Sequence, residues 1–216
     1  MKRIIATILC ALAITSACAK QVIQEQETAT EISGPAETYK AVLRDESGFF
    51  ADGRGMTNKI SLSDLYYDAD EPWEIGQFAV VDLDGNGAFE VVVEEILGGE
   101  RLVLYCYEGN VYGAFFAFRA MMNLKTDGTF AYSGGAAYNG IGQLYALSEG
   151  SAESKVLAES DTLSEEDENG ALLPIYYVDG REATQDEFSA VWDDFTAKED
   201  APWYEFTEEN IERWIA

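Results

Sequence analysis

Histidine is absent from the 216-residue chain, and basic residues are scarce. Without histidine, the Ser-His-Asp and Cys-His catalytic arrangements and all His-ligated zinc or haem sites are excluded. The chain has 14 Lys and Arg residues against 40 Asp and Glu residues, which gives a formal net charge of −26. A molecule this acidic repels phosphate backbones, so we expect no nucleic-acid partner. The same charge attracts divalent cations.

Cysteine is also rare, with three residues in the chain. Cys10 and Cys18 lie near the N-terminus, which leaves Cys106 alone in the remainder and predicts no intramolecular disulfide there. Cys106 lies in the apolar stretch 102–107, which is typical of a buried structural thiol rather than a nucleophile. The apolar content of 47% is enough to fill a core, and the length suits one domain, or one domain plus an appendage.

The first 19 residues have the pattern of an export signal. Lys2 and Arg3 provide a charged start, residues 4–14 are apolar apart from one threonine, and small residues follow at 15–19. The apolar run is shorter than the roughly 20 residues that a membrane-spanning helix needs. We therefore predict a signal peptide over residues 1–19.

Two processing outcomes are open for this signal, besides an uncleaved helix. Ala17-Cys18 resembles a bacterial lipobox, in which Cys18 is lipidated and becomes the new N-terminus, although Thr15 stands where an aliphatic residue is usual. Ala17-Cys18-Ala19 is also an Ala-x-Ala site, which would release a soluble protein that starts at Lys20. We favour the lipoprotein, anchored to the outer face of the cell membrane, over soluble secretion.

The rest of the chain divides into a linker and one predicted α+β domain. Residues 20–34 are rich in Gln, Glu, Thr and Ala and form a flexible linker, and the domain covers 35–216. Helices are predicted at its N-terminal end, over 35–46, and at its C-terminal end, over 184–196 and after Thr207. Between them, short connections predict an antiparallel β meander with strands at 78–81, 89–96, 102–107, 111–118, 120–124, 129–132 and 141–147, and another strand is predicted at 172–178. The polar stretch 148–170 has room for one weak strand.

The segment 82–90 is the most informative part of the chain. Oxygen ligands recur there at the side chains of Asp82, Asp84, Asn86 and Glu90 and at the carbonyl of Ala88. Gly87 permits the sharp bend that turns these groups inward, as in a loop that wraps a hard cation with 6–8 oxygen ligands. Three crowded carboxylates repel one another unless a cation neutralises them. The spacing therefore predicts a structural Ca²⁺ site, since Mg²⁺ prefers a strict octahedron and retains its water.

This loop is not a standard EF-hand, because Val93 takes the place of the bidentate glutamate and the flanks are strand-like. The alternative is an ion-free hairpin, for which Asn86-Gly87 is a strong turn signal. Such a turn has no need of the acids, however. With its flanking strands, the segment 78–93 resembles the calcium loops of FG-GAP and VCBS repeats.

A broader resemblance links the chain to uncharacterised secreted or lipid-anchored proteins of gut Gram-positive bacteria. It is carried by this loop, by Tyr-Lys-Ala-Val-Leu at 39–43 and by Thr-Gln-Asp-Glu-Phe at 184–188. The resemblance implies export and a calcium loop, and it implies no activity.

We therefore expect a non-enzymatic, calcium-stabilised protein of the cell surface that binds an extracellular ligand, either a glycan or a protein. The alternative is a secreted carbohydrate-active enzyme that uses paired carboxylates. Aromatic residues such as Tyr138 and Trp203 could form a sugar-stacking platform, although packing in the core or scattered exposure is the favoured explanation for each of them.

Overall fold

Two large β-sheets and three α-helices form most of the part of the chain that the computed structural model describes, namely residues 34–51, 59–68, 71–97, 99–135, 137–170 and 172–216. The predicted signal peptide and the linker up to residue 33 lie outside the described residues. The helices are α1 (Pro35–Leu43), α2 (Gln185–Ala197) and α3 (Glu208–Trp214), and a 3-10 turn covers Leu62–Asp64.

The first sheet has six strands in the order β1-β7-β6-β5-β4-β13. Its centre is an antiparallel meander of β4 (Ile75–Val81), β5 (Glu90–Glu95), β6 (Arg101–Tyr107) and β7 (Asn110–Phe116). The edges come from distant parts of the chain: β1 (Phe50–Ala51) pairs in parallel with β7, and β13 (Trp203–Glu205) pairs with β4. A separate two-stranded sheet joins β2 (Tyr66–Asp68) to β3 (Glu71–Pro72).

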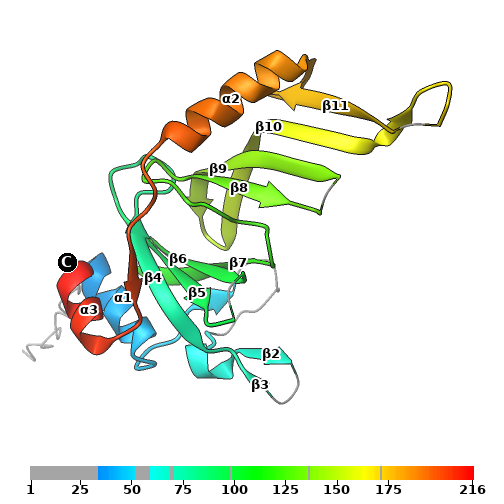
Figure 1. The fold of residues 1–216 in the computed structure, drawn as a ribbon. Coiled ribbons are helices and arrows are strands. Elements are labelled where there is room, and N and C mark those ends of the chain that lie inside the picture. The colour runs from blue at the N-terminus through cyan, green and yellow to red at the C-terminus, as the bar shows by residue number, and fades with distance from the viewer. Residues whose placement is uncertain (1–33, 52–58, 69–70, 98, 136, 171) are drawn as a thin grey trace, which may run out of the picture. The chain divides into compact units, whose positions relative to one another are not determined.

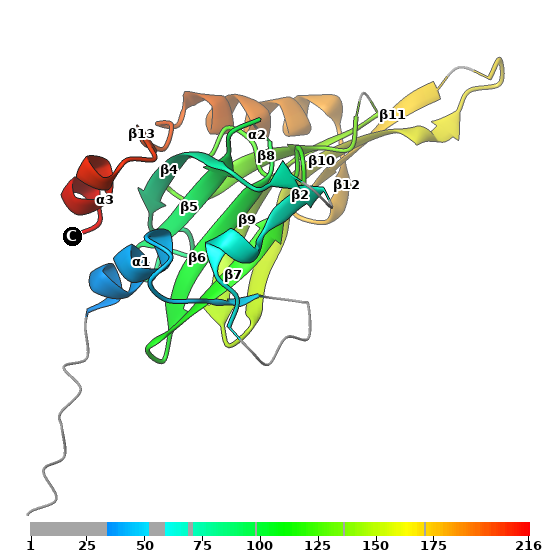
Figure 2. The same ribbon diagram turned by 90° about the horizontal axis from the view of Figure 1, so that it is seen from below.

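The second sheet has five antiparallel strands that follow one another in the chain. They are β8 (Thr129–Ser133), β9 (Tyr138–Ser148), β10 (Ser151–Glu166), β11 (Leu172–Val178) and β12 (Arg181–Ala183). The far end of the β10–β11 hairpin extends beyond α2 in both views (Figures 1 and 2).

The described domain has four layers, and the alternation of side chains along the strands accounts for them. On β5, Val91 and Val93 pack with residues of α1 and α3, whereas Val92 packs between the two sheets. On β8, Phe130 faces the first sheet and Ala131 faces α2. The order is thus α1 with α3, the six-stranded sheet, the five-stranded sheet, and α2 (Figure 1).

The α+β class, the antiparallel pairing and the helices at both ends are confirmed, and several finer expectations are wrong. The predicted single meander is divided into two packed sheets, because the chain leaves the first sheet after β7. Residues 120–124 form no strand: Arg119 and Asn123 have positive φ angles of 64° and 48°, which interrupt extended backbone. The stretch 148–170 contains β10, the longest described strand, rather than one weak strand.

Candidate functional site

The predicted cation loop lies between two paired strand ends. Val81, at the end of β4, is opposite Glu90, at the start of β5. The intervening residues 82–89 therefore form a loop that joins the end of β4 to the start of the neighbouring strand β5. This connection brings the first and last acidic residues of the motif close together.

Asp82 organises the main chain of the loop. Its Oδ1 accepts the N–H groups of Gly85 and Asn86 at 2.8 and 3.1 Å, and its Oδ2 accepts the N–H of Gly87 at 2.9 Å. Gly85 and Gly87 have φ angles of 75° and 87°, in the left-handed region where glycine is favoured. The two glycines let the loop fold around the Asp82 carboxylate.

Three carboxylates converge at this loop. One oxygen each from Asp82, Asp84 and Glu90 can be chosen such that all three lie within 4.8 Å of one another. Ligand oxygens stand about 2.3–2.6 Å from Ca²⁺, so two ligands on opposite sides of the ion are about 5 Å apart. The three oxygens therefore fit on one calcium coordination sphere without a large rearrangement of the main chain.

Glu90 is the buried member of the three carboxylates, whereas Asp82 and Asp84 are partly exposed. Its side chain is 3% exposed, and its Oε2 accepts the N–H of Leu83 at 2.8 Å. Burial, reinforced by the charges of Asp84 and Asp82, raises the pKa of Glu90 to about 8, against the smaller opposing effect of the Leu83 hydrogen bond. A cation bound beside these carboxylates would favour the ionised form of Glu90.

The other two predicted ligands, Asn86 and Ala88, lie in the exposed part of the loop. The Asn86 Oδ1 accepts the N–H of Ala88 at 2.7 Å, so the amide oxygen is engaged by the main chain. Their roles as ligands stay predictions.

Residues outside the motif support the loop, and the spacing of the acids gave no sign of them. Leu83 is fully buried between the sheets. The main chain of Gly128 packs closely against it, since a Cβ at Gly128 would lie 2.2 Å from the carbonyl oxygen of Leu83. Tyr39 of α1 donates through its hydroxyl to the Phe89 carbonyl at 3.2 Å and accepts the Cys106 N–H at 2.8 Å. These contacts fix the loop to the second sheet and to α1.

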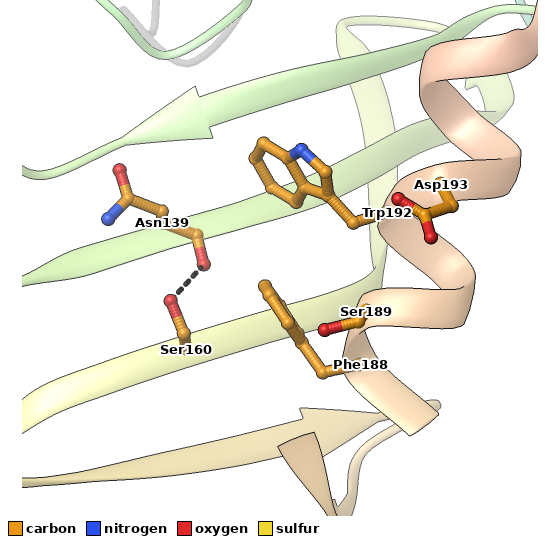
Figure 3. A pocket seen from close by; sticks show the side chains of 6 residues that line it. All are labelled: Asn139, Ser160, Phe188, Ser189, Trp192 and Asp193. Atoms are coloured by element: carbon orange, nitrogen blue, oxygen red, sulfur yellow. Dashed lines mark hydrogen bonds between the residues drawn. The ribbon is translucent and has the colours of Figure 1, made fainter. Parts of the chain in front are cut away.

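A pocket of about 340 Å³ lies between α2 and strands β9 and β10 (Figure 3). The rings of Phe188 and Trp192 extend from α2 across the two strands, with their centroids 5.8 Å apart. The polar residues that line it are Asn139, Ser160, Ser189 and Asp193. Because Phe188 and Trp192 also pack on the core beneath α2, they fix the helix as well as the wall of the pocket.

A second pocket of about 330 Å³ is lined by residues of β8, β9 and β10 of the five-stranded sheet and by Phe116 of β7. We call it the tyrosine groove; its walls include Phe116, Phe130, Tyr132, Tyr138, Val156 and Glu159. The hydroxyls of Tyr132 and Tyr138 each donate to Oε2 of Glu159 at 2.6 Å. The hydrogen bond to Glu159, together with partial burial, raises the pKa of Tyr138 to about 12, so this hydroxyl stays a donor at neutral pH.

Two glycines of β9 leave room for the rings of Tyr132 and Phe130. A Cβ at Gly140 would lie 2.3 Å from the Tyr132 hydroxyl oxygen, and one at Gly142 would lie 2.8 Å from the Phe130 ring. The rings therefore lie directly on the main chain of β9. Tyr138 stands out in the sequence among scattered aromatic residues, but Glu159 does not, because its two hydroxyl partners come from two other strands, β8 and β9.

Comparison with protein-family models, with curated proteins and with solved structures gives no significant match. Among the described residues, no helix combines the length and the apolar character that crossing a membrane requires.

Proposed function

We propose that this protein is exported, anchored to the outer face of the cell membrane by a lipid on Cys18, and stabilised by one structural calcium ion for a non-enzymatic binding role. The observation that carries the calcium assignment is the convergence of Asp82, Asp84 and the buried Glu90 in one loop. The N-terminal pattern supports export, and the loop resembles those of FG-GAP and VCBS repeats.

Calcium suits this loop better than magnesium. The ligand set consists of oxygens from a single loop, and Ca²⁺ accepts 6–8 such ligands in variable geometry, with water completing the sphere. Extracellular calcium modules bind with dissociation constants of about 10⁻⁴–10⁻³ M, which matches an environment with abundant calcium. An ion of this affinity stiffens the connection between β4 and β5 and does not decide whether the domain folds.

The binding role is favoured over the alternative of a carbohydrate-active enzyme by the composition of the two pockets. A glycosidase of the usual type needs two carboxyl groups about 5–10 Å apart across the scissile bond. The residues that line each described pocket include one carboxylate, Asp193 beside α2 and Glu159 in the tyrosine groove. One carboxylate with aromatic neighbours suits recognition of a ligand.

Calcium titration tests the proposal. At about 1 mM Ca²⁺ and an affinity of about 10⁻⁴ M, binding should stabilise the wild-type protein by about 1.4 kcal/mol. The double variant Asp82→Asn/Asp84→Asn retains the size of the side chains and one acceptor oxygen on each, and it loses two charges, so its melting temperature should respond neither to calcium nor to EDTA. Equal melting of the wild type with calcium and with EDTA would refute the calcium site.

A further inference from the structure

We propose that the tyrosine groove binds a small organic ammonium compound, with the cationic head at Glu159 and the apolar part against the rings of Tyr132 and Tyr138. The inference extends the binding role above by naming a ligand class, and it depends neither on calcium nor on export.

The Glu159 carboxylate is held in place, and within the described part of the chain it has no ion-pair partner. Both tyrosine hydroxyls donate to the same oxygen, Oε2, which fixes the group without neutralising it. No hydrogen bond to Oε1 and no ion pair of Glu159 are found among the residues that the structure describes. A positively charged donor is the partner that this second oxygen lacks, and charge-assisted hydrogen bonds are the stronger kind.

The walls of the groove suit the rest of such a ligand. The Tyr132 and Tyr138 rings have centroids 6.1 Å apart, and the Phe116 and Phe130 rings form a second pair at 5.9 Å. Aromatic faces attract cations and cover apolar groups. Tyr138 and Val156 are 39% and 45% exposed, so the groove is open to a ligand.

Size and charge select the class further. A volume of about 330 Å³ is at the small end of ligand sites and suits a compact molecule rather than a folded partner. The net charge of −26 attracts cations and repels anions. One basic residue, Lys155, also lines the groove, but it is exposed and forms no ion pair with Glu159 among the described residues.

Three probes of similar shape separate the contribution of charge from that of the ring: 2-phenylethylammonium, 2-phenylethanol and phenylacetate. Each is titrated into the full protein at about 0.15 M salt, where the general attraction of the acidic surface is screened. Isothermal calorimetry and NMR shifts of the tyrosine rings report binding. We expect the ammonium compound to bind at least about tenfold more tightly than the alcohol and phenylacetate to bind least, because only the ammonium donor adds attraction between opposite charges to its hydrogen bond with Glu159.

Two variants of β10 locate the site. Glu159→Gln keeps an acceptor oxygen for both tyrosine hydroxyls and should weaken ammonium binding at least about tenfold. Glu153→Gln is the matched control, since Glu153 lies on the same strand and also accepts a tyrosine hydroxyl, that of Tyr145, but does not line the groove. It should leave the affinity unchanged.

A third variant keeps the test decisive if Glu159→Gln is unstable. Val156→Lys places a tethered ammonium group at an exposed wall of the groove and should block binding while Glu159 stays intact. The proposal is overturned if the ammonium probe does not bind at millimolar concentration, or if the alcohol or phenylacetate binds as tightly as the ammonium probe. It is also overturned if Glu153→Gln weakens binding as much as Glu159→Gln. We expect the same ammonium affinity in calcium and in EDTA, so failure here leaves the calcium proposal standing, and the reverse also holds.

Discussion

Glu90 is the residue at which burial and charge conflict most directly in the cation loop. Its carboxylate lies at the start of a central strand, with Asp82 and Asp84 beside it. Spacing alone identified Glu90 as a ligand candidate, because it stands at a fixed distance from the acids of the turn. Its burial depends on the contacts of Leu83 and Tyr39 with distant segments, which spacing does not encode.

Replacing Glu90 with glutamine should separate its structural role from its role toward the ion. Glutamine still accepts the Leu83 N–H and is neutral, as the Glu90 carboxyl group largely is near pH 7 when its pKa is about 8, so we expect the calcium-free protein to melt at about the same temperature. The calcium response should shrink: a tenfold loss of affinity from about 10⁻⁴ M reduces the stabilisation at about 1 mM from about 1.4 to about 0.4 kcal/mol. Differential scanning calorimetry with calcium and with EDTA measures both effects.

The control for this prediction is Glu94→Gln on the same strand. Glu94 accepts hydrogen bonds from Arg101 Nε and from Gln77, both at 2.7 Å, away from the loop. Its loss removes a largely buried ion pair, so the variant should be less stable in calcium and in EDTA alike. If Glu90→Gln behaves in the same way, Glu90 is a structural residue and not a ligand.

At the scale of elements, local signals predicted helices well and polar strands poorly. Thr184 and Glu187 form the expected capping box, and α2 begins and ends within a residue of the prediction. β10 carries charged and polar residues on much of its length, so its sequence lacks the apolar alternation of a half-buried strand. Pairing with β9 and β11 on both sides makes it extended, and this is tertiary information.

The contact between α1 and α3 includes ion pairs of Glu212, so we expect the stability that it contributes to depend on pH. Glu212 of α3 pairs with Arg44 and with Lys40 of α1, and these two cations, Arg44 foremost, hold the pKa of Glu212 below its ordinary value. A lowered folded-state pKa contributes stability above the unfolded value of about 4.5, and this contribution is lost as pH falls through the folded-state pKa.

Glu212→Gln should therefore be less stable than the wild type near neutral pH, and the difference should disappear as the pH falls from about 5 to about 3. Urea unfolding midpoints across this range provide the measurement. Glu209→Gln is the control, because it changes the same charge on α3 at an exposed position. A pH-independent difference, or the same profile for Glu209→Gln, would contradict the role given to Glu212.

At the scale of the molecule, the division into two sheets could not be read from the strands themselves. The connection from β6 to β7 and the one from β8 to β9 both follow turn signals, and nothing local marks the longer step between β7 and β8 as a change of sheet. The buried set between the sheets, which includes Val92, Tyr105 and Leu144, comes from strands of both. The return of β13 to pair with β4 likewise depends on packing across more than a hundred residues.

The charge of the whole molecule bears on how it would be held at a membrane. With 40 acidic and 14 basic residues, the protein is repelled by anionic headgroups, so a stable attachment needs a covalent lipid or a membrane-spanning segment. The apolar run at 4–14 is too short for the latter. Attachment through Cys18 follows as the proposed solution, and the stretch 20–34 would serve as the tether.

Expression of the full chain in a Gram-positive bacterium tests this attachment. The wild-type protein should partition into the detergent phase with a lipid on Cys18. Cys18→Ser preserves the Ala-x-Ala pattern around position 18, so this variant should be released as a soluble protein whose first residue is Lys20. Cys106→Ser leaves the signal unchanged and should remain in the detergent phase. A wild-type protein that already begins at Lys20 and stays in the aqueous phase would replace the anchor with soluble secretion, because the acidic surface offers no other attraction to the lipid.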